Sequence, residues 1–154
     1  MSKGVLLFAH NNQSTDYYKM AAFTASRINK FLDLPVSVVT DQASISDSVY
    51  TFDQTIIASP DTSNSRKKTP WINKGRYQAF NFTPYDDTIL LDTDYMINSD
   101  KLLSLFQLPS DIACHNNSRY FFETTPSERL SLNGFKSLWA TVIRFKKTTR
   151  AANL

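Results

Sequence analysis

The amino-acid sequence predicts an α/β fold in which a mostly parallel sheet is flanked by helices. The first observation is a set of short runs rich in apolar residues, which have the length of buried strands and cover 4–9, 36–40, 54–58 and 89–91. The second is the segment 14–32, where apolar residues recur at helical spacing between the first two runs. A strand, a helix and a second strand of this length form a right-handed crossover unit, so the strands are expected to be parallel.

Size and composition favour a single domain with its own core. The chain has 154 residues, a mass of 17.6 kDa and 42% hydrophobic residues. Its 17 basic and 14 acidic residues give a formal charge of +3, which is too small an excess to indicate nucleic-acid binding and also suits a polyanionic small ligand. Cys114 is the only cysteine, so we expect a buried thiol in a reducing, cytoplasmic compartment. The apolar run 5–9 is too short for a transmembrane segment.

The helix between the first two strands is predicted from its cap and its apolar stripe. Ser14 or Thr15 is expected to supply the N-cap, and the helix is expected to end near Leu32. The residues at helical spacing should face the core: Tyr18, Ala21, Ala22, Ala25, Ile28 and Leu32.

Polar residues follow the first two strands, at the edge where a nucleotide would lie. His10 and Asn11 come directly after the first strand, and Asp41 comes after the second. Two of these residues have a purely structural alternative. His10 also suits a loop residue bonded to backbone, and Asp41 also suits a helix cap onto 43–47. No glycine-rich phosphate loop follows the first strand, which excludes the common dinucleotide and Walker-type sites.

The middle of the chain contains the basic residues nearest to the later acidic segment. A polar loop is expected over 59–69, followed by a helix over 70–80 that begins at a proline. Lys74 and Arg76 lie on this helix as candidate phosphate ligands, with ordinary surface charge as the alternative. Gly75 costs a helix about 1 kcal/mol relative to alanine, which suggests a close approach there.

An apolar strand that stops at two acids is the most informative segment. Asp92 and Asp94 directly follow the run 89–91. Acids at i and i+2 of an extended chain lie on the same side, where they can hold one hard divalent cation, and such a cation can bridge a diphosphate. The same spacing also occurs in solvated turns and helix caps. Further elements are expected after it: a helix to residue 106, a strand over 111–115, a helix and turn over 126–134, and a strand over 138–145.

The segment 89–97, followed by the apolar run 102–106, resembles the Asp-x-Asp segment of GT-A glycosyltransferases. Residues 71–77 are similar to the basic-aromatic helix that precedes this strand in those enzymes, and residues 139–145 are similar to their later strand. The resemblance implies one Rossmann-like, GT-A-like domain over 1–154 that corresponds to the nucleotide-binding half.

The same resemblance implies transfer of a sugar from a nucleotide-diphosphate sugar to an unknown acceptor, with Mn²⁺ or Mg²⁺ and with a UDP-sugar as the expected donor. It makes Asp94 a direct metal ligand and Asp92 a ligand of metal or ribose. It assigns Lys74 or Arg76 to the diphosphate or the sugar, and Asp41 to the base or the ribose.

The resemblance leaves one alternative open, and residue patterns exclude others. In the resembled enzymes a later portion, beyond the end of this chain, supplies a further metal ligand and much of the acceptor site. The alternative is therefore an inactive nucleotide-binding remnant that acts as a structural or interaction protein. Haloacid-dehalogenase-type phosphatases place Asp-x-Asp on the first strand and carry a small residue where this chain has Met96. A nucleotidyltransferase would need a glycine-rich first loop, and nucleic-acid binding would need aromatic residues among the basic ones.

Overall fold

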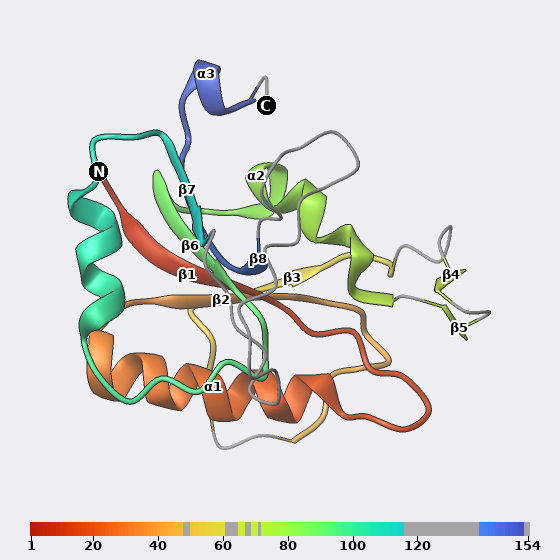
Figure 1. The fold of residues 1–154 in the computed structure, drawn as a ribbon. Helices are drawn as coiled ribbons and strands as arrows, with labels where there is room; N and C mark the ends of the chain where they lie inside the picture. Colours follow the sequence, from red (N-terminus) through yellow and green to blue (C-terminus); the bar gives the residue numbers. More distant parts are fainter. Residues whose placement is uncertain (48–49, 61–64, 67–68, 71, 116–138, 153–154) are drawn as a thin grey trace, which may run out of the picture.

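A computed structural model describes the residues 1–47, 50–60, 65–66, 69–70, 72–115 and 139–152 (Figure 1). They contain a six-stranded sheet with the order β3-β2-β1-β6-β8-β7. Its strands are β1 (Lys3–Phe8), β2 (Val36–Thr40), β3 (Gln54–Ile57), β6 (Asp87–Leu91), β7 (Ile112–His115) and β8 (Trp139–Lys146). The pairs β1–β2, β1–β6 and β2–β3 are parallel, whereas β8 runs antiparallel to both β6 and β7. The predicted α/β fold with a mostly parallel sheet is confirmed.

The side of the sheet on which the chain adds new strands changes at β1. From β1 the chain adds β2 and β3 on one side, and it later adds β6 on the other side. Val5 of β1 is in register with Val36 of β2 and with Ile89 of β6, so these three strands end at one edge of the sheet. In open α/β sheets, ligands bind outside the carboxyl ends of the strands at such a reversal. The fold therefore places the residues that follow β1 and β6 at the edge where a ligand is expected.

Helices cover both faces of the sheet. Figure 1 shows α1 (Tyr17–Leu32) along one side of the sheet and α2 (Ala79–Phe82) on the other. The core under α1 also includes apolar residues of η2 (Lys101–Gln107), which is a 3₁₀ helix. The core under α2 is smaller and is formed by Leu6, Phe8, Val39, Ala79, Leu90 and Phe145. Among the described helices, none is long and apolar enough to cross a lipid bilayer.

The first helix has the predicted buried stripe but a different N-cap. All six residues expected in the stripe are buried. The cap is Asp16 and not Ser14 or Thr15, because the Asp16 carboxylate accepts a hydrogen bond from the Lys19 amide at 2.9 Å. This hydrogen bond, which is the largest cause, lowers the pKa of Asp16. The helix ends at Asp33, which adopts the left-handed conformation with φ of 51°.

The region predicted as a loop and a helix contains shorter elements. Within 59–69 lies part of a two-stranded pair, β4 (Ser65–Arg66) with β5 (Thr69–Pro70), so Pro70 ends a strand and does not begin a helix. The predicted helix over 70–80 is a 3₁₀ helix, η1 (Ile72–Gln78), that continues into α2. The expected close approach at Gly75 is wrong, because among the described residues a Cβ there would meet only Phe8 Cε1, at the ordinary contact distance of 3.9 Å.

The second half of the chain also departs from the predictions. The helix expected to residue 106 is the 3₁₀ helix η2, and Cys114 is exposed where a buried thiol was expected. Cys114 lies on β7, the outermost strand of the sheet, which has β8 as its only neighbour within the described sheet. The chain then passes through β8 to a short helix, α3 (Thr149–Ala152). The predicted helix and turn over 126–134 lie outside the described residues.

A buried ion pair joins β8 to β6 at the edge opposite to the expected ligand edge. Arg144 is 0% exposed, and its Nε and Nη2 donate to the two carboxylate oxygens of Asp87, each at 2.6 Å. Its Nη1 donates to the carbonyl of Ser110 in the segment before β7. The Arg144 guanidinium therefore connects β8 with β6 and with the segment that leads into β7.

Gly4 is the glycine at which the fold requires the absence of a side chain. A Cβ there would lie 2.4 Å from Tyr85 ring atoms, and the Tyr85 hydroxyl is held by Ser37 at 2.7 Å. Burial raises the pKa of Tyr85 to about 12, so the hydroxyl stays neutral. We expect Gly4→Ala to lower the free energy of unfolding by about 1–3 kcal/mol through overpacking, measured by urea denaturation. Gly75→Ala is the matched control, and an equal loss there would contradict this account.

Candidate functional site

The ligand edge carries two groups of polar residues. The first group, which we call the lip clasp, consists of Asn11, Asp16 and Ser44 near the ends of β1 and β2. The second group, which we call the acidic turn, is the segment 92–95 that directly follows β6. Since β1 and β6 are neighbours in the sheet, both groups border the same edge.

The acidic turn differs from the extended chain that was expected. The Tyr95 amide donates to the Asp92 carbonyl at 3.2 Å, which closes a β-turn around Thr93 and Asp94. The Thr24 hydroxyl of α1 donates to the Thr93 carbonyl at 2.5 Å, so packing against the helix holds the bend. Asp94 is exposed, whereas 33% of the Asp92 side chain is exposed. The two acids therefore follow one strand but differ in their surroundings.

Arg76 brings η1 onto the acidic turn. Its Nη1 donates to Asp92 Oδ1, and its Nη2 donates to the Ala140 carbonyl of β8 at 2.9 Å. The adjacent carbonyl of β8, that of Thr141, accepts from the Asp92 amide at 3.1 Å. The Arg76 side chain is only 20% exposed. Of the two basic residues predicted near the acids, Arg76 lies at the acidic turn, while the side chain of Lys74 lies outside the description.

Burial governs the electrostatics of this pair. Desolvation raises the pKa of Asp92, and the Arg76 guanidinium and a hydrogen bond from Thr141 only partly offset it. Desolvation lowers the pKa of Arg76, and Asp92 and Asp94 both act in the opposite direction. An arginine remains protonated at any ordinary pH, so the pair and Asp94 together supply one positive and two negative charges.

The two carboxylates have the chemistry of a site for a hard divalent cation that arrives with phosphate. Within the described residues, no three His, Cys, Asp or Glu side chains come together to hold a metal ion. Mg²⁺ is commonly held by one or two carboxylates together with substrate phosphates, and Asp92 and Asp94 suit that arrangement. The exposure of Asp94 leaves its carboxylate open to a ligand from solvent.

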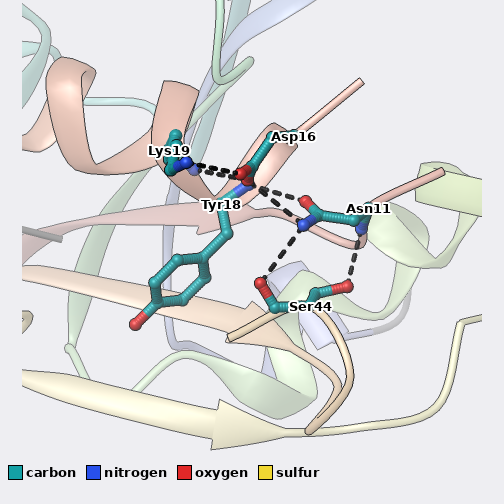
Figure 2. A network of polar contacts seen from close by, with 5 residues as sticks. All are labelled: Asn11, Asp16, Tyr18, Lys19 and Ser44. Carbon is teal, nitrogen blue, oxygen red and sulfur yellow. Dashed lines mark hydrogen bonds and ion pairs between the residues drawn. The ribbon is translucent and has the colours of Figure 1, made fainter. Parts of the chain in front are cut away.

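The lip clasp uses the polar groups of Asn11 for contacts within the protein. Figure 2 shows the Asn11 amide between α1 and the segment after β2: Nδ2 donates to Asp16 Oδ1 at 3.1 Å and to the Ser44 carbonyl at 3.2 Å. Its Oδ1 accepts from the Tyr18 amide at 2.9 Å, and its backbone amide donates to Ser44 Oγ at 2.7 Å. Both protons of the Asn11 side-chain amide are therefore donated to acceptors within the protein. Asn11 thus positions the segments that follow β1 and β2.

The other two residues predicted at this lip are also hydrogen-bonded within the fold. His10 is 3% exposed, and its Nε2 donates to the Ala58 carbonyl at 2.8 Å, in agreement with the backbone-bonded alternative. Asp41 Oδ1 accepts from the Ser44 amide at 2.8 Å, which caps a turn and not the alternative helix. Sequence reasoning missed Ser44 because nothing in its neighbourhood marks a partner 33 residues away.

We expect Asn11→Ala to lower the free energy of unfolding by about 1–3 kcal/mol, because several donors and acceptors of the lip clasp lose their partner. Urea denaturation followed by circular dichroism measures this loss. Asn12→Ala is the matched control. Asn12 is exposed, and its Oδ1 accepts hydrogen bonds at the surface from the amides of Ser14 and Thr15 and from the Ser14 hydroxyl. Equal losses in the two variants would contradict the positioning role of Asn11.

Comparison with known proteins places this geometry in a structural context. No protein-family model matches the chain, and no curated protein matches it. Solved structures do match. The glycosyltransferase GlyE of Streptococcus pneumoniae TIGR4 is 13% identical with a TM-score of 0.58, and the match covers 99% of this chain and 36% of GlyE. The galactosyltransferase LgtC, in complex with donor and acceptor sugar analogues, is 11% identical with a TM-score of 0.64, and the match covers 97% of this chain and 59% of LgtC.

At this level of identity the similarity shows the fold. The chain has the mixed, mostly parallel α/β sheet with flanking helices that these glycosyltransferases share. It spans less than two thirds of the length of either protein. The expectation of a fold similar to that of glycosyltransferases is therefore confirmed.

Proposed function

We propose that this chain binds the diphosphate of a nucleotide-diphosphate sugar at the acidic turn and transfers the sugar to an acceptor. The observation that carries the proposal is the placement of Arg76, Asp92 and Asp94 together at the end of β6. This end lies at the reversal of strand order in a sheet similar to those of GlyE and LgtC.

The chemistry needs charge stabilisation at the diphosphate. Breaking the bond between the sugar carbon and the diphosphate oxygen leaves the electron pair, and hence a growing negative charge, on the departing diphosphate. A bound Mn²⁺ or Mg²⁺ would stabilise that charge. Asp92 and Asp94 would hold the cation, and the guanidinium of Arg76 would face the same phosphate oxygens as a fixed donor. Lys74 is proposed as a second cation for the diphosphate or the sugar.

The nucleoside would bind at the carboxyl ends of β1 and β2. Asp41 uses one carboxylate oxygen for the Ser44 amide, and we assign its other oxygen to the base or the ribose. His10 and Asn11 would then shape the pocket through the contacts that they make within the protein. A uridine donor is proposed as the first to be tested. The structure of LgtC with donor and acceptor sugar analogues supports the proposal of a sugar donor and an acceptor for this chain.

Isothermal titration calorimetry of UDP with Mn²⁺ or with EDTA tests the proposal. We expect binding with Mn²⁺ and at least tenfold weaker binding with EDTA, which is about 1.4 kcal/mol. Binding would justify a screen of UDP-sugars for hydrolysis and transfer. If UDP, GDP and CDP all fail to bind with Mn²⁺, the proposal is wrong, and the chain is better described as a remnant with a structural or interaction role.

A further inference from the structure

The contact between Arg76 and Asp92 affects how ligands would bind at the acidic turn. Arg76 contacts Asp92, one of the two carboxylates proposed to hold the cation. The Arg76 side chain is 20% exposed and has a second contact to the Ala140 carbonyl, so the guanidinium is anchored at two points. The acidic turn thus has a fixed positive charge supplied by the protein itself.

A divalent cation arriving alone meets a site whose negative charge is partly cancelled by Arg76. It must approach a largely buried guanidinium, and its strongest interaction is with Asp94, since the charge of Asp92 is balanced by Arg76. Like charges in a partly dry environment repel more strongly than they do in water. A diphosphate changes this balance, because its negative oxygens compensate both the guanidinium and the arriving cation.

We infer that Arg76 is a resident counter-cation that makes the binding of a divalent cation at the acidic turn depend on the binding of a diphosphate. The inference rests on the proposed function for the identity of the two ligands. Such a coupling is reciprocal: the factor by which the diphosphate raises cation affinity equals the factor by which the cation raises diphosphate affinity. Removal of Arg76 should therefore strengthen binding of the cation alone and reduce the coupling.

The test measures Mn²⁺ binding from the electron paramagnetic resonance signal of the free ion, with and without saturating UDP. For the wild-type chain, UDP is expected to raise the affinity for Mn²⁺ by about tenfold or more. For Arg76→Met, Mn²⁺ alone should bind about fivefold or more tightly than it binds the wild type, and UDP should raise that affinity by a smaller factor. Lys147→Met is the control for net charge, since Lys147 donates to the Thr83 carbonyl away from the acidic turn, and it should behave as the wild type.

Arg76→Lys keeps a positive charge, but a lysine lacks the planar fork that contacts Asp92 and Ala140 together. This variant should therefore give a Mn²⁺ affinity and a coupling factor between those of the wild type and Arg76→Met. It also replaces Arg76→Met in the test where that variant does not fold. Equal Mn²⁺ affinity in the wild type and in a folded Arg76 variant would overturn the inference, as would an unchanged coupling factor. Failure of the proposed function is a different result. In that case UDP does not bind the wild type, while Arg76→Met still binds Mn²⁺ more tightly than the wild type does.

Discussion

Asp94→Asn is expected to abolish Mn²⁺-dependent binding of UDP while leaving the thermal midpoint of unfolding unchanged. Asp94 is exposed, so its carboxylate is stabilised by water and contributes little to the fold. The same exposure makes it the carboxylate that is open to a cation, and an amide oxygen without charge is a far weaker ligand for Mn²⁺. Calorimetry and differential scanning fluorimetry on one preparation measure both quantities. We expect the affinity for UDP with Mn²⁺ to fall by about 100-fold or more, which is about 2.8 kcal/mol.

Asp92→Asn provides the contrast. This change should also weaken binding, but it leaves the guanidinium of Arg76 largely buried without its ionic partner, so the thermal midpoint should fall as well. Asp100→Asn is the control, because Asp100 is an exposed acid shortly after the acidic turn whose side chain makes no capping hydrogen bond. Unchanged UDP binding in Asp94→Asn would exclude this residue as a metal ligand. Equal destabilisation by Asp92→Asn and Asp94→Asn would contradict the difference in burial.

Asp87→Asn is expected to lower the free energy of unfolding by about 3–5 kcal/mol, which is a large part of the stability of a domain of this size. Arg144 is completely buried, and the substitution removes the carboxylate charge that balances its guanidinium. The other hydrogen bonds of the guanidinium go to the carbonyls of Leu108 and Ser110, which carry no charge. Urea denaturation followed by circular dichroism measures this loss. Where the variant is too unstable to purify, a lower yield of soluble protein than that of Asp86→Asn indicates the loss of stability.

The neighbouring acid is the matched control for that change. Asp86 is exposed, and its carboxylate accepts hydrogen bonds from the Ser2 amide and hydroxyl near the N-terminus. Asp86→Asn should therefore cost little, since water replaces the lost contacts. The double variant Asp87→Leu with Arg144→Met should recover much of the stability lost in Asp87→Asn, because it leaves no charge unpaired in the core. Failure of the double variant to recover stability would show that the pair is needed for more than charge balance.

The strands of the parallel half of the sheet could be predicted because their signal is local. A run such as 89–91 is apolar in consecutive residues, and so short a run is typical of a strand buried on both faces. The stripe of α1 was predicted for a similar reason, since residues at helical spacing share one face. The acidic residues after β6 were found because they interrupt such a run abruptly.

The long-range contacts of the fold and of the candidate site could not be predicted, because their partners are distant in the sequence. Asp87 and Arg144 are 57 residues apart, and each alone resembles an ordinary surface charge. The positioning role of Asn11 depends on Ser44, and only the fold brings these two residues together. The helix expected from residue 70 shows a different limit: Pro70 suits the first turn of a helix and equally suits a short strand, so tertiary pairing with Ser65 decided its structure.

The late position of β8 in the chain determines when the acidic turn can form during synthesis. The carbonyls of Ala140 and Thr141 hold Arg76 and Asp92, and Arg144 of the same strand secures the start of β6. A nascent chain that has emerged only as far as β7 contains both acids and Arg76, but it lacks the strand that completes β6 on its second side. Proteins are made from the N-terminus, and pairings that span long stretches of sequence form late. The half of the sheet built from β1, β2 and β3 is therefore translated first, and the ligand edge gains its final wall only after β8 has been translated.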